Sequence, residues 1–485
     1  FSAAKSALSI STSPRTSNSA GCFSPSAGAE KFAPKHAKQD IHCYNKPLCV
    51  EVSPTPFMKQ ISRKITHWQQ NLPHHLESTL FDRNLLRRGD AYDKPLFWVL
   101  LCLLCFGLVM VYSASGVQAG LYHFDNRASF LIKQTQFALI GGAACYLLMR
   151  VPLWRWQRWD KYLFYIALIS LFAVLFVGEQ VNGARRWLPT PFGFKVQASE
   201  IFKLVTIIYM ANFFRRKIDI LHDFKRVIMV GIPVTLGAML IYFTRDLGSA
   251  VVVFSIFLAL LFLANMPKSW FFSAIGIAVL VGVVAIWGNE YRLRRVEVMW
   301  QPWNDPTGTG YQGLGSLLSL QRGGLFGEGL GNAVIKRGFL PEAHTDFILA
   351  VIGEELGLVT VAALVLLYVW IIWRAFSIGK LARDLELYFN SFMAVGIGVW
   401  IAVQTFINVG VNISLLPNKG LTLPLISYGG SSLVIMMIAL MLLLRVDYEN
   451  RRVLLGHSVT DPKQPAPRPQ PQTDTAEPED ISDKA

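Results

Sequence analysis

Long apolar blocks alternate with short polar segments along most of the chain. Each block has roughly 18 to 25 residues and is long enough to cross a ~30 Å hydrocarbon core as an α-helix. A large soluble bundle would need polar stripes on these helices, and a block such as PLFWVLLCLLCFGLVMVYSASG has none. The pattern predicts an all-α polytopic membrane protein. Its ten predicted transmembrane helices cover about 95–115, 130–149, 162–179, 198–214, 227–243, 247–266, 270–288, 346–373, 389–411 and 424–444.

Composition agrees with this pattern and separates the two ends from the middle. Of the 485 residues, 52% are hydrophobic and 16% are charged, whereas a soluble domain carries about 25% charged residues. We expect a membrane domain at 91–452. We expect disorder in the basic segment 1–90, which has no apolar run and no secretory signal core, and in the Pro-rich acidic segment 453–485. The first methionine is Met58, and we expect natural translation to start there, which would leave 1–57 untranslated.

Lys and Arg residues cluster in the connections that follow even-numbered blocks, and this bias predicts the orientation. Loops rich in Lys and Arg remain cytoplasmic, so both termini are predicted to be cytoplasmic and the long segment 289–345 to be a large periplasmic loop between helices 7 and 8. The net charge of +14 follows largely from this bias and from the basic N-terminal segment, so no nucleic-acid partner is needed to explain it. The cations are Arg150, Arg155, Arg158, Lys161, Arg215, Arg216, Lys217, Lys225, Arg226, Arg374, Lys380, Arg383 and those of RVDYENRR.

Some cations lie on the outer side, against the bias. Arg185, Arg186 and Lys195 fall in the outer loop NGARRWLPTPFGFKVQ. Arg binds phosphate through its planar guanidinium group, so an anion-binding role is one explanation. Pairing with lipid head groups or with local acids is the alternative.

Several ionisable residues lie inside the blocks but near the predicted outer face. Glu200 and Lys203 are three apart on one helical face, Asp246 lies at an outer turn, and Lys419 precedes the last block. Each such residue costs about 2.5–3.5 kcal/mol to insert, so it is a candidate for function. Together they predict one outward-facing polar pocket. The alternative is a set of structural ion pairs that lock helices together.

The segment LPEAHTDFILAVIGEELG concentrates further ionisable groups at the start of the eighth block. Asp346 opens the helix, and Glu354 lies about 12 Å deeper and about 80° around the axis, so both can face one cavity. Glu355 points nearly opposite to Asp346 and is predicted to brace neighbouring helices. His344 is expected to be a loop or capping residue, and Glu342 to support Asp346.

Six motifs in this order resemble the SEDS family, the membrane glycosyltransferases of bacterial cell-wall synthesis. They are NGARRW, the DLG at 246–248, QPWNDPTGTGYQ, LPEAHTDFI, IGEELG and LPNKGLTLPLISYGGSS, and the resemblance covers about 90–452. The stretch KGLTLPLISYGGSS favours the division branch of the family over its elongation branch. The chain departs from the family pattern at Thr244 and Arg245, where Gln-Pro is usual, and at Ala198, where Pro is common. We expect an altered local backbone at these positions.

The resemblance implies an inverting polymerisation of lipid II into β-1,4 glycan. The family's proposed catalytic acid matches Asp346, which we expect to be ionised because a helix N-terminus stabilises an anion. Asp346 would act as a general base or would bind a divalent cation, Mg²⁺ or Mn²⁺. The residues left for substrate binding include the acids Glu200, Asp246 and Glu354. The leaving pyrophosphate is expected to meet Arg185, Arg186, Lys195, Lys203 and Lys419.

The resemblance also implies partners and a location. No outer loop is large enough for a domain that cross-links peptides, so the family suggests a class B penicillin-binding protein and other division proteins as partners in the bacterial inner membrane at the septum. Membrane lipids surround the helices. Three alternatives stay open: a flippase that moves lipid II between leaflets, an elongation polymerase, and a non-catalytic scaffold. The sequence shows no clear internal repeat of the kind common in transporters.

Overall fold

A helix of the described residues overlaps each of the ten apolar blocks, as expected because a backbone in hydrocarbon must satisfy its own hydrogen bonds. The starts differ most at two blocks, because α5 begins before block 162–179 and α14 begins inside block 424–444. The computed structural model describes 92–122, 128–181, 184–189, 195–216, 224–288 and most of 290–455, and the expectations for 1–90 and for nearly all of 453–485 fall outside these residues. The helices are α3 (Lys94–Tyr122), α4 (Ser129–Leu148), α5 (Leu153–Val177), α6 (Ala198–Arg216), α7 (Phe224–Phe243), α8 (Leu247–Leu263), α9 (Lys268–Trp287), α12 (Ile348–Asp384), α13 (Tyr388–Asn412) and α14 (Gly430–Leu454).

Length and composition identify a multi-pass membrane protein. Within the described residues, five helices are long and apolar enough to cross a membrane: Lys94–Gly116, Leu153–Val177, Ile348–Asp384, Tyr388–Asn412 and Gly430–Leu454. Three shorter apolar helices cover Ile228–Phe243, Leu247–Leu263 and Lys268–Val284. The predicted class, a helical polytopic membrane protein, is confirmed.

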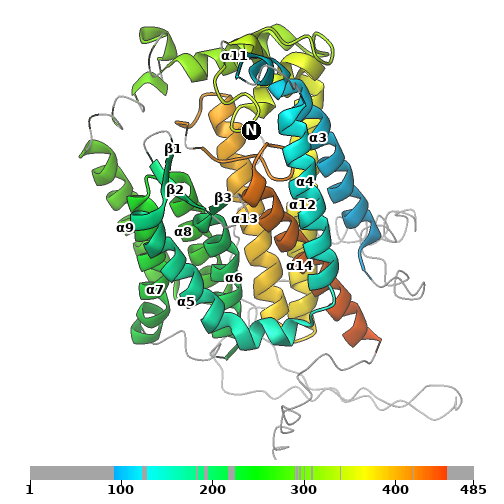
Figure 1. The fold of residues 1–485 in the computed structure, drawn as a ribbon. Coiled ribbons are helices and arrows are strands. Elements are labelled where there is room, and N and C mark those ends of the chain that lie inside the picture. The colour runs from blue at the N-terminus through cyan, green and yellow to red at the C-terminus, as the bar shows by residue number, and fades with distance from the viewer. Residues whose placement is uncertain are drawn as a thin grey trace, which may run out of the picture. The chain divides into compact units, whose positions relative to one another are not determined.

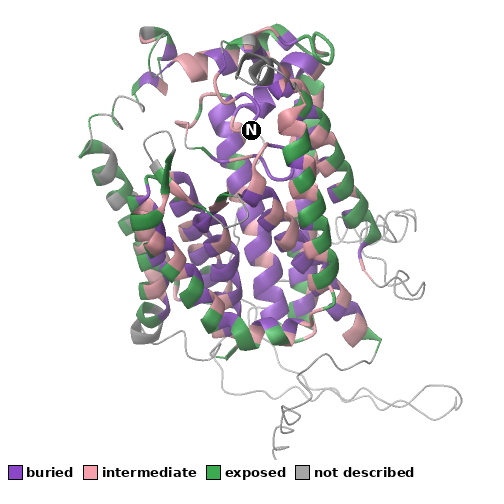
Figure 2. Ribbon diagram, viewed as in Figure 1, coloured by how far each residue is buried: buried purple, intermediate pink, exposed green. Residues whose placement is uncertain are grey.

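The helices α6, α13 and α14 form the buried centre of the described helices (Figures 1 and 2). Helix α12 packs against α13, α5 packs against α6, and α14 packs against α4. Trp400, Phe202 and Phe214 fill the interior. Large apolar side chains on the peripheral helices stay exposed, as at Leu139 and Phe176, and this is the surface expected to face lipid.

The all-α prediction misses a small sheet between α5 and α6. Strands β1 (Glu179–Val181), β2 (Ala184–Pro189) and β3 (Lys195–Gln197) form an antiparallel sheet in the order β1-β2-β3. The two residues between β1 and β2 are Asn-Gly, the pair that favours a two-residue hairpin turn. The sheet holds the outer loop against the start of α6, where β3 leads directly into the helix.

The segment between α9 and α12 is predicted to be periplasmic and is named the outer segment for that reason. Its described part contains η3 (Pro302–Asn304), α11 (Tyr311–Gly323) and η4 (Ile335–Arg337). The glycine-rich stretch after α11 pairs with a break in α12 at Gly357, where φ is 81° and ψ is 172°. Four backbone N–H groups donate across this contact: Glu328 to Glu354 O (3.0 Å), Gly329 to Glu355 O (2.9 Å), Leu358 to Gly324 O (2.9 Å) and Val359 to Leu325 O (3.2 Å). The outer part of α12 and this stretch therefore form one hydrogen-bonded unit.

Candidate active site

Asp346 lies in the turn before α12, slightly outside the helix that it was predicted to open. Phe347 is the N-cap and the helix begins at Ile348. The carboxyl group is partly buried. Burial and the nearby carboxylate of Glu342 raise the pKa of Asp346 to about 7, against the lowering effect of Arg186. Asp346 is therefore only about half ionised at pH 7, less than the sequence analysis expects, because desolvation outweighs the lowering by Arg186.

Arg186 is the cation that the structure brings to Asp346. A Cβ atom placed on Gly420 would lie 3.3 Å from Nη1 of Arg186 and 3.7 Å from Oδ2 of Asp346, so both side chains lie against the side of Gly420 where a larger residue would carry its side chain. Gly420 has φ of 68°, a conformation that favours glycine. Arg186 Nη2 also donates to the carbonyl oxygen of Arg245, whose own φ is 63°. A guanidinium group and a carboxyl group thus face one small space.

Arg185 points away from this space. Successive side chains of a strand point to opposite faces, and both arginines lie on β2. Arg185 Nη1 donates to the carbonyl oxygen of Leu175 in α5 at 3.3 Å. The structure therefore separates two cations that the sequence analysis had grouped.

Asp246 caps α8 and ties it to the start of α6. Its Oδ1 accepts from Ser249 N at 3.2 Å, and its Oδ2 accepts from Gln197 Nε2 and from Ser199 Oγ, each at 3.0 Å. Only 1% of the residue is exposed. An N-cap carboxylate with these bonds holds the two helix starts together, and it lies close enough to Asp346 to add to the rise of that pKa.

Glu200 and Lys203 form a buried ion pair inside the bundle. Lys203 Nζ lies 2.7 Å from Glu200 Oε1 and 3.3 Å from Gln404 Oε1, and it sits 5.1 Å from the centre of the Trp400 ring. The side chain of Lys203 is 0% exposed. This arrangement favours the structural interpretation for Lys203, because contact with a substrate would require breaking the pair.

The remaining predicted cations are Lys195 and Lys419. Lys195 of β3 pairs with Glu179 of β1, 2.7 Å away, and both side chains are about half exposed. Lys419 lies outside the described residues, directly before Gly420.

Both glutamates of IGEELG hold the outer segment onto α12. Glu354 Oε1 accepts from Val334 N at 2.7 Å and from Ile335 N at 3.3 Å. Glu355 pairs with the buried Lys336 and accepts from Ser113 Oγ of α3. The bracing role predicted for Glu355 is confirmed. Glu354 also pairs with Arg322 of α11, whose Nε lies 3.6 Å from Oε1. Its placement in the substrate pocket stays a prediction.

His344 belongs to an aromatic cluster. Its ring lies 4.6 Å from that of Phe130 and 5.4 Å from that of Tyr428. Burial lowers the pKa of His344, so the imidazole is neutral at pH 7. Its carbonyl oxygen accepts from Tyr428 N at 2.9 Å. The residue therefore joins the Asp346 turn to the loop before α14, as expected for a loop residue.

Two asparagines that the sequence analysis did not select hold the Asp346 turn. Asn408 Nδ2 and Asn412 Nδ2 each donate to the carbonyl oxygen of Asp346 at 3.0 Å. The signal in the sequence was an amide pair at four-residue spacing in the apolar stretch FINVGVN. An uncharged amide in a transmembrane helix is a weak signal on its own, because it needs only one partner on a neighbouring helix.

A metal site is not evident among the described side chains. No three His, Cys, Asp or Glu residues within that part of the chain are grouped to hold a metal ion. Asp246, the carboxylate nearest to Asp346 on another element, already uses both oxygens. These residues alone do not form a Mg²⁺ or Mn²⁺ site.

Fold and site together define a class of protein: a polytopic helical membrane protein with a carboxyl group and a guanidinium group facing each other beyond the helix ends. The family model of cell cycle proteins that groups FtsW, RodA and SpoVE matches residues 94–452, and the chain belongs to this family.

Relatives and solved structures agree with the family. The chain is 41% identical over 427 residues to the "Probable peptidoglycan glycosyltransferase FtsW" of Neisseria gonorrhoeae, covering 79% of this chain and 90% of the relative. It is 42% identical over 361 residues to the protein of the same name in Escherichia coli O6:H1, covering 74% and 87%. A chain of a peptidoglycan synthase complex matches with a TM-score of 0.60 and 27% identity, covering 74% of this chain and 98% of its own. Thermus thermophilus RodA matches with a TM-score of 0.54 and 27% identity, covering 75% and 99%.

Proposed function

We propose that this protein is a peptidoglycan glycosyltransferase of the FtsW type, which polymerises lipid II into β-1,4 glycan during septal cell-wall synthesis. The observation that carries the proposal is the pair of Asp346 and Arg186, whose charged groups both lie close to Gly420. The family match and the names of the relatives support the same reaction.

Asp346 is suited to the proton transfer that the reaction needs. The 4-hydroxyl of the acceptor sugar attacks the anomeric carbon of the donor, and its proton passes to a base. A general base is most effective when its pKa lies near the working pH. The pKa of about 7 for Asp346 meets this condition, because the carboxylate is available at neutral pH and is basic enough to take the proton.

Arg186 is suited to the other half of the reaction. As the new glycosidic bond forms, the bond from the anomeric carbon to the polyprenyl pyrophosphate breaks and leaves charge on the pyrophosphate. A preorganised guanidinium group stabilises such charge in a site of low dielectric constant. Arg185, Lys195 and Lys419 are proposed to contact the pyrophosphate or its head group on approach. Glu200, Lys203, Asp246 and Glu354 shape the surrounding walls.

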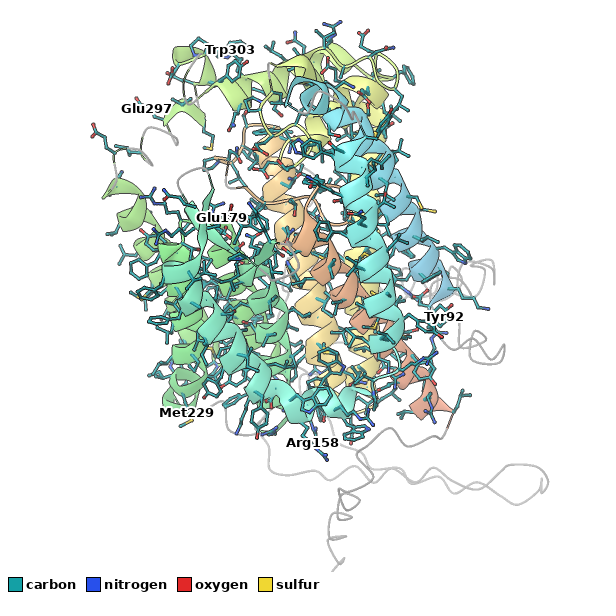
Figure 3. The ribbon with its side chains drawn as sticks, in the orientation of Figure 1. Tyr92, Arg158, Glu179, Met229, Glu297 and Trp303 are labelled. Carbon is teal, nitrogen blue, oxygen red and sulfur yellow. The ribbon has the colours of Figure 1, made fainter. Side chains whose placement is uncertain are left out.

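The proposed topology places this site at the periplasmic face. All ten helices are proposed to cross the inner membrane at the division septum, with both termini in the cytoplasm. Figure 3 shows Glu179, Glu297 and Trp303 toward one end of the described helices and Arg158 and Met229 at the other. The first turns of α5, which carry Arg155 and Arg158, thus lie opposite the sheet and the outer segment, as the charge bias predicts.

A class B penicillin-binding protein of the FtsI type is the proposed partner. A structural neighbour is part of a peptidoglycan synthase complex that coordinates polymerization and crosslinking. We propose that other division proteins act through this pair.

The test is purified protein reconstituted with lipid II, with and without the partner, assayed for glycan chains and separately for lipid translocation.

Asp346→Asn should abolish glycan synthesis while the protein stays folded. Because ionisation of a carboxyl group with a raised pKa opposes folding above that pKa, the variant should keep or raise Tm at pH 8. Glycan synthesis by Asp346→Asn at the wild-type rate would refute the assignment. Translocation without polymerisation by the wild type would favour a flippase.

A further inference from the structure

One face of α13 carries three amide side chains at four-residue spacing: Gln404, Asn408 and Asn412. Residues four apart lie above one another on a helix and about 6 Å apart along its axis. These residues are 1%, 1% and 0% exposed. Buried amides need hydrogen-bond partners, so the partners show what this face of the helix does.

Asn408 is the member of this face that joins two segments. Its Nδ2 donates to the carbonyl oxygen of Asp346 at 3.0 Å and to that of Leu421 at 2.8 Å. An amide NH₂ group has two hydrogens, so each carbonyl takes one. The turn before α12 and the loop before α14 are thus held by a single side chain of a third element.

The flanking amides each serve one segment. Asn412 Nδ2 donates to the carbonyl oxygen of Asp346, and its Oδ1 accepts from Ala350 N, each at 3.0 Å. Gln404 Nε2 donates to the carbonyl oxygen of Thr422 at 2.8 Å. Asn412 therefore supports the turn and Gln404 the loop, while Asn408 fixes one relative to the other.

That relative position determines the geometry of the site. Gly420, next to Leu421, lies beside both the guanidinium group of Arg186 and the carboxyl group of Asp346, which are 3.3 and 3.7 Å from the position that its Cβ atom would take. A displacement of about 1 Å at a reacting centre can lower a rate by about 10²-fold. A small shift of the loop against the turn would therefore change the space that the two charged groups share.

We propose that Asn408 is a positioning residue for the glycosyl transfer, which holds the Asp346 turn and the 420–422 loop at a fixed separation. The inference rests on the proposed function. Asn408 donates to backbone carbonyl groups and not to the carboxyl group, so it moves no proton itself. Its loss should lower kcat and leave KM for lipid II nearly unchanged, because the surface that binds the substrate stays in place.

The experiment compares three variants in the reconstituted full chain with its partner. Asn408→Ala removes both donors. Asn408→Gln keeps an NH₂ group but moves it outward by one methylene group. Asn390→Ala is the matched control: Asn390 lies on the same helix, is 3% exposed, and donates to Asn450 Oδ1 at 3.4 Å, away from the Asp346 turn.

We expect kcat to fall about 10- to 100-fold in Asn408→Ala and in Asn408→Gln, with KM within about threefold of wild type. Asn390→Ala should lower Tm as much as Asn408→Ala does and keep kcat within about threefold.

The proposal is overturned if Asn408→Gln folds with the wild-type Tm and polymerises at the wild-type kcat, or if Asn390→Ala loses as much kcat as Asn408→Ala. A rise in KM at constant kcat would also overturn it. If Asn408→Ala does not fold, the kcat and Tm of Asn408→Gln provide the test. Absence of glycan synthesis by the wild type would instead refute the proposed function.

Discussion

At the scale of single residues, the raised pKa of Asp346 predicts the pH dependence of the reaction. A general base acts in its deprotonated form, so kcat/KM should rise with pH and level off above about 7, the value to which burial and Glu342 raise this pKa. Arg186 lowers the pKa of Asp346, so Arg186→Gln should move the rising limb to higher pH. The measurement is the rate of glycan synthesis between pH 5.5 and pH 9. A flat profile in the wild type would contradict the role of Asp346 as base.

Substitutions of the two arginines of β2 should slow polymerisation to different extents. Arg186→Ala removes a guanidinium group that faces Asp346 and should slow polymerisation by about 10- to 100-fold, or ~1–3 kcal/mol, the range for a hydrogen bond to a charged group. Arg185→Ala removes an exposed side chain that is bonded to Leu175 O. Because solvent screens this cation, its removal should change the polymerisation rate by less than about threefold. Glycan yield and protein abundance should be measured together. Equal losses in the two variants would show that the strand does not separate their roles.

Sequence patterns identify the charged residues of the site more readily than the uncharged residues that hold them in place. Asp346 and Arg186 are charges in unusual places, and a charge near a membrane face has a cost that singles it out. Asn408 carries no charge, and its role depends on which turn α13 meets in the folded protein. Lys203 is the opposite case, because its charge made it a candidate for binding, whereas the structure buries it against Glu200 and Trp400.

At the scale of elements, the break in α12 predicts a position that accepts only glycine. Gly357 has φ of 81°, and a Cβ atom there would lie 2.3 Å from Leu325 O. Gly357→Ala should therefore destabilise the protein by more than the ~1–3 kcal/mol of backbone strain alone. Gly276→Ala in α9 is the control, because no atom lies within 4 Å of its Cβ position, and it should be neutral or slightly stabilising. Thermal unfolding of the detergent-solubilised protein measures both. Similar Tm values for the two variants would contradict the packing at Gly357.

Hydrophobic periodicity explains why the helices were predicted and why other elements were not. Twenty apolar residues leave few alternatives to a helix in a membrane. The strands are only three to six residues long, too short for an alternating pattern, and Asn-Gly was the one local signal. The break at Gly357 was not predicted, because a single glycine within a helical pattern does not by itself mark a break.

At the scale of the whole molecule, the proposed orientation predicts which positions react from outside the cell membrane. Phe326 is 82% exposed in the outer segment, and Lys380 is exposed near the other end of α12. In a background without the native cysteines, a membrane-impermeant thiol reagent should label Phe326→Cys but not Lys380→Cys in intact spheroplasts. Permeabilised cells provide the control, since both positions should then react. The reverse pattern would invert the topology and place Asp346 on the cytoplasmic side.

The backbone pairing at the break in α12 has a consequence for hydrogen exchange. Glycine-rich loops normally exchange their amide protons with deuterium within seconds, because their N–H groups face water. The amides of Glu328, Gly329, Leu358 and Val359 all donate to carbonyl groups across the contact. Exchange there requires the loop and the helix to separate, so these four amides should exchange as slowly as those of the adjacent helix core. A stretch that looks like a flexible linker in the sequence should therefore behave as one of the slowest-exchanging parts of the outer segment.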